Sequence, residues 1–266
     1  MLSNRLFTVL AFTLAGLVVS QDQPFSLNFE DSQFQTGQIT GRINDPVQQF
    51  DLSDFTVIEA QNLPEKSVPA ASLKTSLLRP CTSSHYISRI SPNFQDRVTD
   101  RGKTVGIKIA KGLDGQPLFR SFDLGSICMG CIFVPAITQG SSLIDLIPSD
   151  PLTQMVLPAS CEITLTGTKY ITPQSNEKTT ITTTVKFEAN PPLDIAKATT
   201  LRATDMMIYS FNDNWKNLES IQFKIQKVKV NLPVGLPAQF DPILSTTTLI
   251  DSLALDNFNG TKHAST

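Results

Sequence analysis

Stretches in which apolar and polar residues alternate recur along this 266-residue chain, and they restrict its fold more than any other property of the sequence. A period of two is typical of β-strands with one buried face. After Ile225 the apolar positions change parity, which predicts a β-bulge or a strand break near residues 226–227. The predicted strands and apolar runs include 25–29, 55–58, 105–109, 181–187, 206–209 and 221–225.

Turn-forming residues separate these strands, and no convincing 3.6-residue stripe predicts a helix. Most of the 17 prolines fall in four segments, 61–82, 139–158, 188–198 and 231–248. The pattern predicts an all-β chain, a single antiparallel β-sandwich with long loops. Two smaller sandwiches remain an alternative.

Composition excludes several classes of protein. Hydrophobic residues make up 40% of the chain and charged residues 17%, which is enough apolar surface for an ordered core. The formal net charge of −2 offers no basic surface for nucleic acid or for an anionic membrane.

The two ends of the chain predict export. Residues 1–20 combine Arg5, a short apolar run and a small residue at Ser20, as in a secretory signal peptide cleaved after Ser20. A signal anchor is the alternative. The C-terminus is polar, so we expect no membrane anchor and a protein secreted to the extracellular space. Residues 259–266 read as a polar tail after a domain at 21–258, and the Asn259 sequon in this exposed tail is a predicted glycosylation site.

An even number of cysteines in an exported chain predicts two disulfides, with three possible connectivities for Cys81, Cys128, Cys131 and Cys161. A three-residue offset places Cys128 and Cys131 on opposite faces of one strand, which argues against a bond between them. Cys161 shares its parity with the apolar Ile163 and Leu165, which predicts that its side chain faces the core. We therefore favour Cys131–Cys161 and Cys81–Cys128. A redox C-x-x-C lacks the helix that it needs, and a zinc site lacks a second closely spaced pair of ligands.

The order of segments resembles a known group of proteins. Phe29-Glu30-Asp31 closes the first strand, Ile163–Gly167 follows the cysteine-bearing strand, Trp215–Phe223 leads a later strand, and Leu255-Asp256-Asn257 ends the last. Over residues 25–258 this layout is similar to the secreted jelly-roll domains of filamentous fungi, echoed in bacterial surface proteins. Their architecture is similar to that of carbohydrate-binding modules. The resemblance implies a jelly-roll fold and a non-enzymatic protein that binds a glycan, a cell-wall polysaccharide or an extracellular surface. A polysaccharide hydrolase or lyase on this scaffold is the alternative.

The residues themselves predict no cofactor for this chain, whereas the same resemblance implies a structural calcium ion. In jelly rolls of this kind acidic residues on the first and last strands often hold Ca²⁺, and the matching positions are Glu30, Asp31 and Asp256. The alternative is that these carboxylates are solvated charges at the edge of a sheet.

Few residues suggest catalysis or ligand binding directly. His85 is the only histidine away from the C-terminal tail, and no G-x-S-x-G, H-E-x-x-H or phosphate-binding loop is present. Asp96, Asp100 and Arg101 are the best candidates for paired acid and base chemistry. Trp215 lies in a polar stretch and could stack on a sugar ring, or it could close the end of the sandwich.

Overall fold

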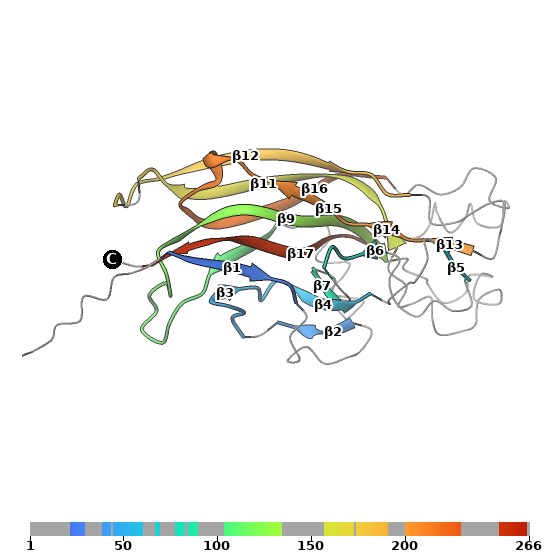
Figure 1. Cartoon of the computed structure of the whole chain (residues 1–266), viewed down its shortest axis with the longest axis horizontal. Helices are drawn as coiled ribbons and strands as arrows, with labels where there is room; N and C mark the ends of the chain where they lie inside the picture. Colours follow the sequence, from blue (N-terminus) through green and yellow to red (C-terminus); the bar gives the residue numbers. More distant parts are fainter. Residues whose placement is uncertain are drawn as a thin grey trace, which may run out of the picture.

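In the computed structural model, strands and one 3-10 turn account for the regular structure of the described part of the chain (Figure 1). The described residues are 22–29, 39–43, 45–60, 67–69, 78–82, 85–89, 104–134, 157–172, 174–190, 200–229 and 250–264. The strands are β1 (Gln23–Leu27), β2 (Ile39–Arg42), β3 (Phe50–Asp51), β4 (Thr56–Glu59), β5 (Ser67–Pro69), β6 (Leu78–Arg79), β7 (His85–Ser88), β8 (Val105–Ile109), β9 (Ser121–Val134), β10 (Leu157–Pro158), β11 (Ser160–Tyr170), β12 (Lys178–Phe187), β13 (Thr200–Arg202), β14 (Thr204–Asp205), β15 (Met207–Ser210), β16 (Leu218–Lys229) and β17 (Ile250–His263). The turn η4 covers Asp213–Trp215. The all-β prediction is confirmed.

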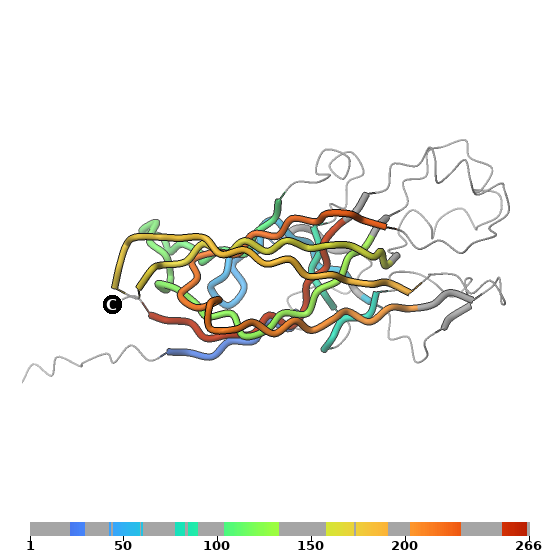
Figure 2. The backbone as a smooth tube through the Cα atoms, turned by 90° about the horizontal axis from the view of Figure 1, so that it is seen from above, coloured from blue at the N-terminus to red at the C-terminus, as the bar shows by residue number. Residues whose placement is uncertain are grey.

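One large antiparallel sheet contains most of these strands, in the order β12-β11-β16-β9-β17-β7-β4-β2. Strand β1 adds to β17, β15 and β10 add to β9, and β8 joins β16 to β3. The sheet is curled, so that β11 and β12 lie above β9 and β17 (Figure 1). The start of β1 and the C-terminus lie at the same end of the molecule (Figure 2).

The core lies inside this curled sheet and is rich in phenylalanine. At its centre Phe50 lies 4.8 Å from Phe25, 5.3 Å from Phe122 and 5.4 Å from Phe258, measured between ring centroids. These three pairs are tilted or edge-to-face, the geometry that aromatic quadrupoles favour. The alternation at residues 25–29 predicts this burial, because Phe25, Leu27 and Phe29 are the buried set.

The change of parity in β16 corresponds to a bulge. Glu162 pairs with Gln226, but Ser160 pairs with Lys229, so the register with β11 shifts between these two pairs. Lys227 has a φ of 49°, which is unusual for a side-chain-bearing residue and typical of a bulge. The prediction near 226–227 is confirmed.

Both disulfides join β9 to neighbouring segments: Cys81 bonds Cys128 and Cys131 bonds Cys161. These are the pairs that strand parity favours. No cysteine is free, so neither a dithiol C-x-x-C nor a zinc-thiolate site exists. Because β10 pairs with β9 and leads straight into β11, it delivers Cys161 to the core side of β9. Two disulfides are typical of proteins that fold in an oxidising compartment.

The C-terminal residues do not form the tail that the sequence predicts. Strand β17 runs through residues 259–263 and stays paired with β9 up to His263. Gly260 is required there, because a Cβ atom would lie 1.9 Å from the carbonyl oxygen of Asp123. Residues 1–20 lie outside the described residues, and the described part contains no helix long and apolar enough to cross a membrane.

Candidate functional site

Six threonines form a grid on the outer surface of the sheet. Three come from β11 and three from β12, and each pair lies directly opposite in the register of the two strands. We call this grid the threonine face; its residues are Thr164, Thr166, Thr168, Thr180, Thr182 and Thr184. The alternate residues of the same strands, such as Ile163 and Leu165, are buried in the core. The grid therefore points away from the core.

The threonine face is open to solvent. The three threonines of β12 are exposed and the three of β11 are half-buried. The hydroxyl oxygens of Thr164 and Thr184 lie 3.2 Å apart, within hydrogen-bond distance. Threonine suits this position because its branched β-carbon favours strands while its hydroxyl remains hydrated. The result is a regular, uncharged surface of hydroxyl and methyl groups.

Polar side chains of β16 extend this surface on one side. Ser220, Gln222 and Lys224 lie opposite Thr168, Thr166 and Thr164 in the register of β11 and β16. Gln222 and Lys224 are exposed. Their amide and ammonium groups add donors and acceptors beside the hydroxyl rows.

Charged residues border one end of the threonine face. Glu162 lies 2.8 Å from the ammonium of Lys227 and 3.7 Å from that of Lys186. The hydrogen bond from Lys227 lowers the pKa of the Glu162 carboxyl, so this residue is ionised at neutral pH. Since the two lysines balance it, the border carries no excess of negative charge that would repel a neutral ligand.

The opposite end of the face holds an aromatic ring. Tyr170 follows the β11 threonines at the next outward position, opposite Lys178. The guanidinium of Arg120 lies 4.9 Å and the ammonium of Lys178 lies 5.3 Å from the ring centroid. These are cation–π distances, so the ring is held in place by two cations.

No protein-family model, curated protein or solved structure matches this chain. The functional assignment therefore depends on the geometry of its own residues.

The indole of Trp215 does not present a stacking surface. Its side chain is 5% exposed, and its ring packs 5.0 Å from that of Phe211. A Cβ atom on Gly167 would lie 3.2 Å from the indole, which shows how closely β11 covers the ring. Of the two roles that the sequence suggests for Trp215, sugar stacking is thus incompatible with its burial, whereas closure of one end of the core agrees with it. The ring closes the end of the core, because η4 turns it inward.

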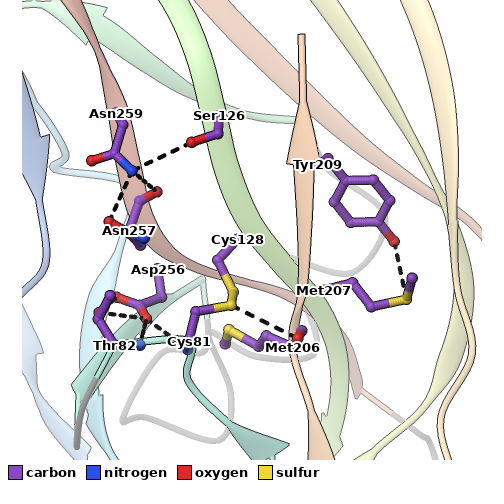
Figure 3. The surroundings of a disulfide bond; sticks show 10 residues. All are labelled: Cys81, Thr82, Ser126, Cys128, Met206, Met207, Tyr209, Asp256, Asn257 and Asn259. Atoms are coloured by element: carbon purple, nitrogen blue, oxygen red, sulfur yellow. Dashed lines mark hydrogen bonds between the residues drawn. A yellow bond between two sulfur atoms is a disulfide. The ribbon is translucent and has the colours of Figure 1, made fainter.

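The calcium residues are only partly described. Glu30 and Asp31 lie outside the described residues, whereas Asp256 is fully buried on β17. One oxygen of Asp256 accepts hydrogen bonds from the backbone N–H of Cys81 at 2.9 Å and from that of Thr82 at 3.0 Å (Figure 3). The Thr82 hydroxyl also donates to this carboxylate, at 2.9 Å. In the part of the chain that the structure covers, no three His, Cys, Asp or Glu residues are grouped to hold a metal ion.

Asp256 fixes the loop that carries Cys81. We call residues 78–82 the anchored loop, since the Cys81–Cys128 disulfide and the Asp256 carboxylate both hold it on the same side of β9 and β17 (Figure 3). Burial raises the pKa of the Asp256 carboxyl, although hydrogen bonds from Thr82 and Cys81 oppose the rise. Leu78 of this loop covers Gly130, where a Cβ atom would lie 3.0 Å from the leucine.

Asn259 occupies a central strand and not an exposed chain end. It pairs with Ser26 of β1 on one side and Ser126 of β9 on the other. Its side-chain nitrogen donates to the Asn257 side chain at 2.9 Å and to the Ser126 hydroxyl at 3.3 Å (Figure 3). In the folded protein the side-chain nitrogen of Asn259, to which a glycan would be attached, is already engaged in hydrogen bonds.

His263 joins both ends of the domain. Its Nδ1 lies 2.8 Å from Asp22 and its Nε2 lies 2.8 Å from Asp123. Desolvation lowers the pKa of His263, but the two carboxylates outweigh it, so the pKa is raised overall. With a carboxylate at each nitrogen, this imidazole is a structural clamp and not an available general base. Asp96, Asp100 and Arg101 lie outside the described residues.

Sequence analysis missed the threonine face, although its signal is present. Threonine occurs at every second position in 164–168 and again in 180–184. The alternation analysis assigned the odd-numbered residues to the core and left the even-numbered residues without a role. The sequence does not show that the two threonine rows are adjacent, because this depends on the pairing of β11 with β12.

Proposed function

We propose that this chain is a secreted, non-enzymatic β-sandwich protein of jelly-roll type that binds a glycan, such as a cell-wall polysaccharide, on its threonine face. The observation that carries the proposal is the in-register pairing of the threonines of β11 with those of β12. Export is supported by the signal-like residues 1–20 and by the two disulfides.

The chemistry of the face suits a neutral polymer that is rich in hydroxyl groups. Each threonine hydroxyl can donate one hydrogen bond and accept two, as can each hydroxyl of a sugar. One such bond contributes only about 0.5–1.5 kcal/mol net, so useful affinity needs a row of them. The strand repeat supplies this row, and a linear polysaccharide supplies a matching series of groups.

The proposed binding mode differs from sugar stacking. Trp215 is buried, and the ring of Tyr170 is held between cationic side chains at the end of the face. Hydrogen bonds and methyl contacts are therefore the interactions available over the grid. This predicts moderate affinity for single chains and better retention on insoluble polymers, where many weak contacts act together.

The test is a pull-down of the mature secreted protein with insoluble chitin, β-glucan and mannan, followed by a broad glycan array. The Thr166→Ala, Thr182→Ala double variant removes two hydroxyls at the centre of the grid. Thr172→Ala, at an exposed turn position outside the grid, is the matched control. We expect the double variant to lose most of its retention and the control to keep it.

Two results would overturn the proposal. The first is an array without any bound glycan. The second is release of soluble sugar from the same polymers, which would assign the chain to the hydrolases or lyases.

A further inference from the structure

Strand β12 is the last strand on one side of the large sheet. It pairs with β11 along all ten of its residues, and no strand follows it in the order of the described strands. An edge of this length presents a row of backbone N–H and C=O groups that can pair with another chain.

Two contacts show which residues face the free edge. The Tyr209 hydroxyl donates to the backbone carbonyl of Lys186 at 2.5 Å, and Tyr209 comes from β15, which pairs with β9 and not with β11. Because backbone groups alternate along a strand, Thr184, Thr182 and Thr180 share this orientation. The short distance between the hydroxyl oxygens of Thr164 and Thr184 supports this orientation. In an antiparallel pair of strands, side chains approach most closely at residue pairs that exchange no backbone hydrogen bonds, so the backbone groups of Thr184 point away from β11.

Proline and a β-bulge, two of the devices that protect an edge strand, are missing from β12. It contains no proline, and its register with β11 has no shift. Its terminal lysines are partly neutralised, because Lys178 lies 2.8 Å from Glu219 and Lys186 lies 3.7 Å from Glu162. The apolar side chains of Ile181 and Val185 are only half-buried at this edge.

We propose that β12 pairs in antiparallel fashion with β12 of a second copy of this chain, about a two-fold axis that passes beside Thr183. The even-numbered residues of both copies must then exchange the backbone hydrogen bonds. This pairing gives about eight such bonds across the join. Tyr209 need not leave, because the Lys186 carbonyl oxygen has a second lone pair.

Charge decides between the two most central registers. An axis beside Thr182 would place Lys178 opposite Lys186 of the second copy, and like charges directly opposite are unfavourable. An axis beside Thr183 places Lys178 opposite Glu188, and both of these residues are exposed in the single chain. The same register places Ile181 opposite Val185, so it also covers the half-buried apolar side chains of this edge.

The dimer has a consequence for the threonine face. A two-fold axis perpendicular to a sheet keeps the outward residues of both copies on the same side, so the two grids become one continuous surface. The inference does not depend on the proposed function, because the argument for pairing uses only the edge of β12.

The first experiment measures mass by sedimentation equilibrium over a wide range of protein concentration. We expect a monomer–dimer equilibrium for the full secreted chain. Thr182→Pro removes an N–H that points to the free edge and leaves the pairing with β11 intact, so this variant should be monomeric. A single chain at every concentration, or an unchanged equilibrium for Thr182→Pro, would overturn the proposal.

Two further variants test the register. Glu188→Lys places like charges together twice in each dimer, and we expect an increase of about tenfold in the dimer Kd. The double exchange Lys178→Glu, Glu188→Lys should restore the Kd, whereas Asp45→Lys, at a remote exposed position, should leave it unchanged. A double exchange no tighter than Glu188→Lys alone would contradict the register.

Cross-linking gives an independent reading of the axis. Thr183 lies opposite itself across the axis, so Thr183→Cys should form a disulfide-linked dimer on a non-reducing gel. Thr180→Cys is the control, because this residue lies roughly 20 Å from its own copy in the same register. Equal cross-linking at the two positions would show random collision and refute the pairing.

Discussion

Replacing Asp256 with asparagine tests whether the anchored loop is held by a carboxylate. Asp256 is fully buried and accepts two backbone N–H groups and one hydroxyl from Cys81 and Thr82. An asparagine of the same shape keeps one acceptor oxygen, but its N–H₂ group replaces the other oxygen, so a donor then faces the donors of Cys81 and Thr82. Hydrogen bonds to a charged group contribute about 1.5–3 kcal/mol each, and the cost of burying the charge offsets part of this. We therefore expect Asp256→Asn to lower the free energy of unfolding by about 2–3 kcal/mol.

Calorimetry of the disulfide-intact protein measures this loss. For a domain of this size the expected fall in Tm is about 4–12 °C. Asp213→Asn is the control, because Asp213 is exposed and pairs with the exposed Lys216; its effect should stay within about 0.5 kcal/mol. Thr82→Ala should lose less than Asp256→Asn, since it leaves both backbone N–H donors in place.

Two outcomes would refute the reasoning. An Asp256→Asn variant as stable as the parent would show that the carboxylate does not anchor the loop. A fall in the Tm of the parent protein on addition of EDTA, absent in Asp256→Asn, would show that Asp256 holds a cation, as the resemblance to calcium-binding jelly rolls implies.

Three further predictions concern β17. His263→Gln should destabilise the protein more at pH 6 than at pH 9. The pKa of His263 is raised above its ordinary value of 6.5 in the folded protein, so its stabilising effect is complete below pH 6.5 and is lost as pH rises through the folded pKa. Equal losses of stability at both pH values in urea titrations would contradict this. Gly260→Ala should lower the free energy of unfolding by about 3 kcal/mol or more, because the added Cβ atom would overlap with the Asp123 carbonyl. Gly125→Ala, whose nearest contact would be 3.4 Å, should lower it far less. The yield of folded protein measures both effects. The intact mass of the protein made in a eukaryotic host should show Asn259 without a glycan, because its Nδ2 is engaged between Asn257 and Ser126. A glycan found there in natively folded protein would refute this geometry.

Local properties of the sequence were sufficient to predict several features of the fold. The alternation at residues 25–29 predicts which side chains face the core. A shift of the strand by one residue would turn its phenylalanines toward solvent, so only one orientation is stable. The parity change after Ile225 reports the bulge in β16 for the same reason. Parity also favours the pairs Cys131–Cys161 and Cys81–Cys128, because a cysteine must first share a face with its partner.

The sequence could not predict features that depend on partners from elsewhere in the chain. Residues 259–263 are polar and read as a tail, yet β9 and β1 supply hydrogen bonds on both sides and make them part of a strand. For Trp215 the sequence suggests two roles, a sugar-stacking surface or a ring that closes the end of the core, and the turn η4 decides for the second because it directs the ring inward.

The anchored loop and the threonine face together explain why one surface of the sheet is available for binding and another is not. Around Cys128 and Asp256 the side of the sheet that faces away from the core is covered, because a disulfide and a buried carboxylate hold residues 78–82 over it. On β11 and β12 the corresponding outward positions hold threonine, which needs no cover because its hydroxyl is solvated. From Ile127 to Ile132 strand β9 has buried residues on both faces and reads as an apolar run interrupted only by Gly130, whereas β11 and β12 alternate. The difference between the two patterns therefore locates the open surface, and it also leaves β12 with an edge that a second chain can extend.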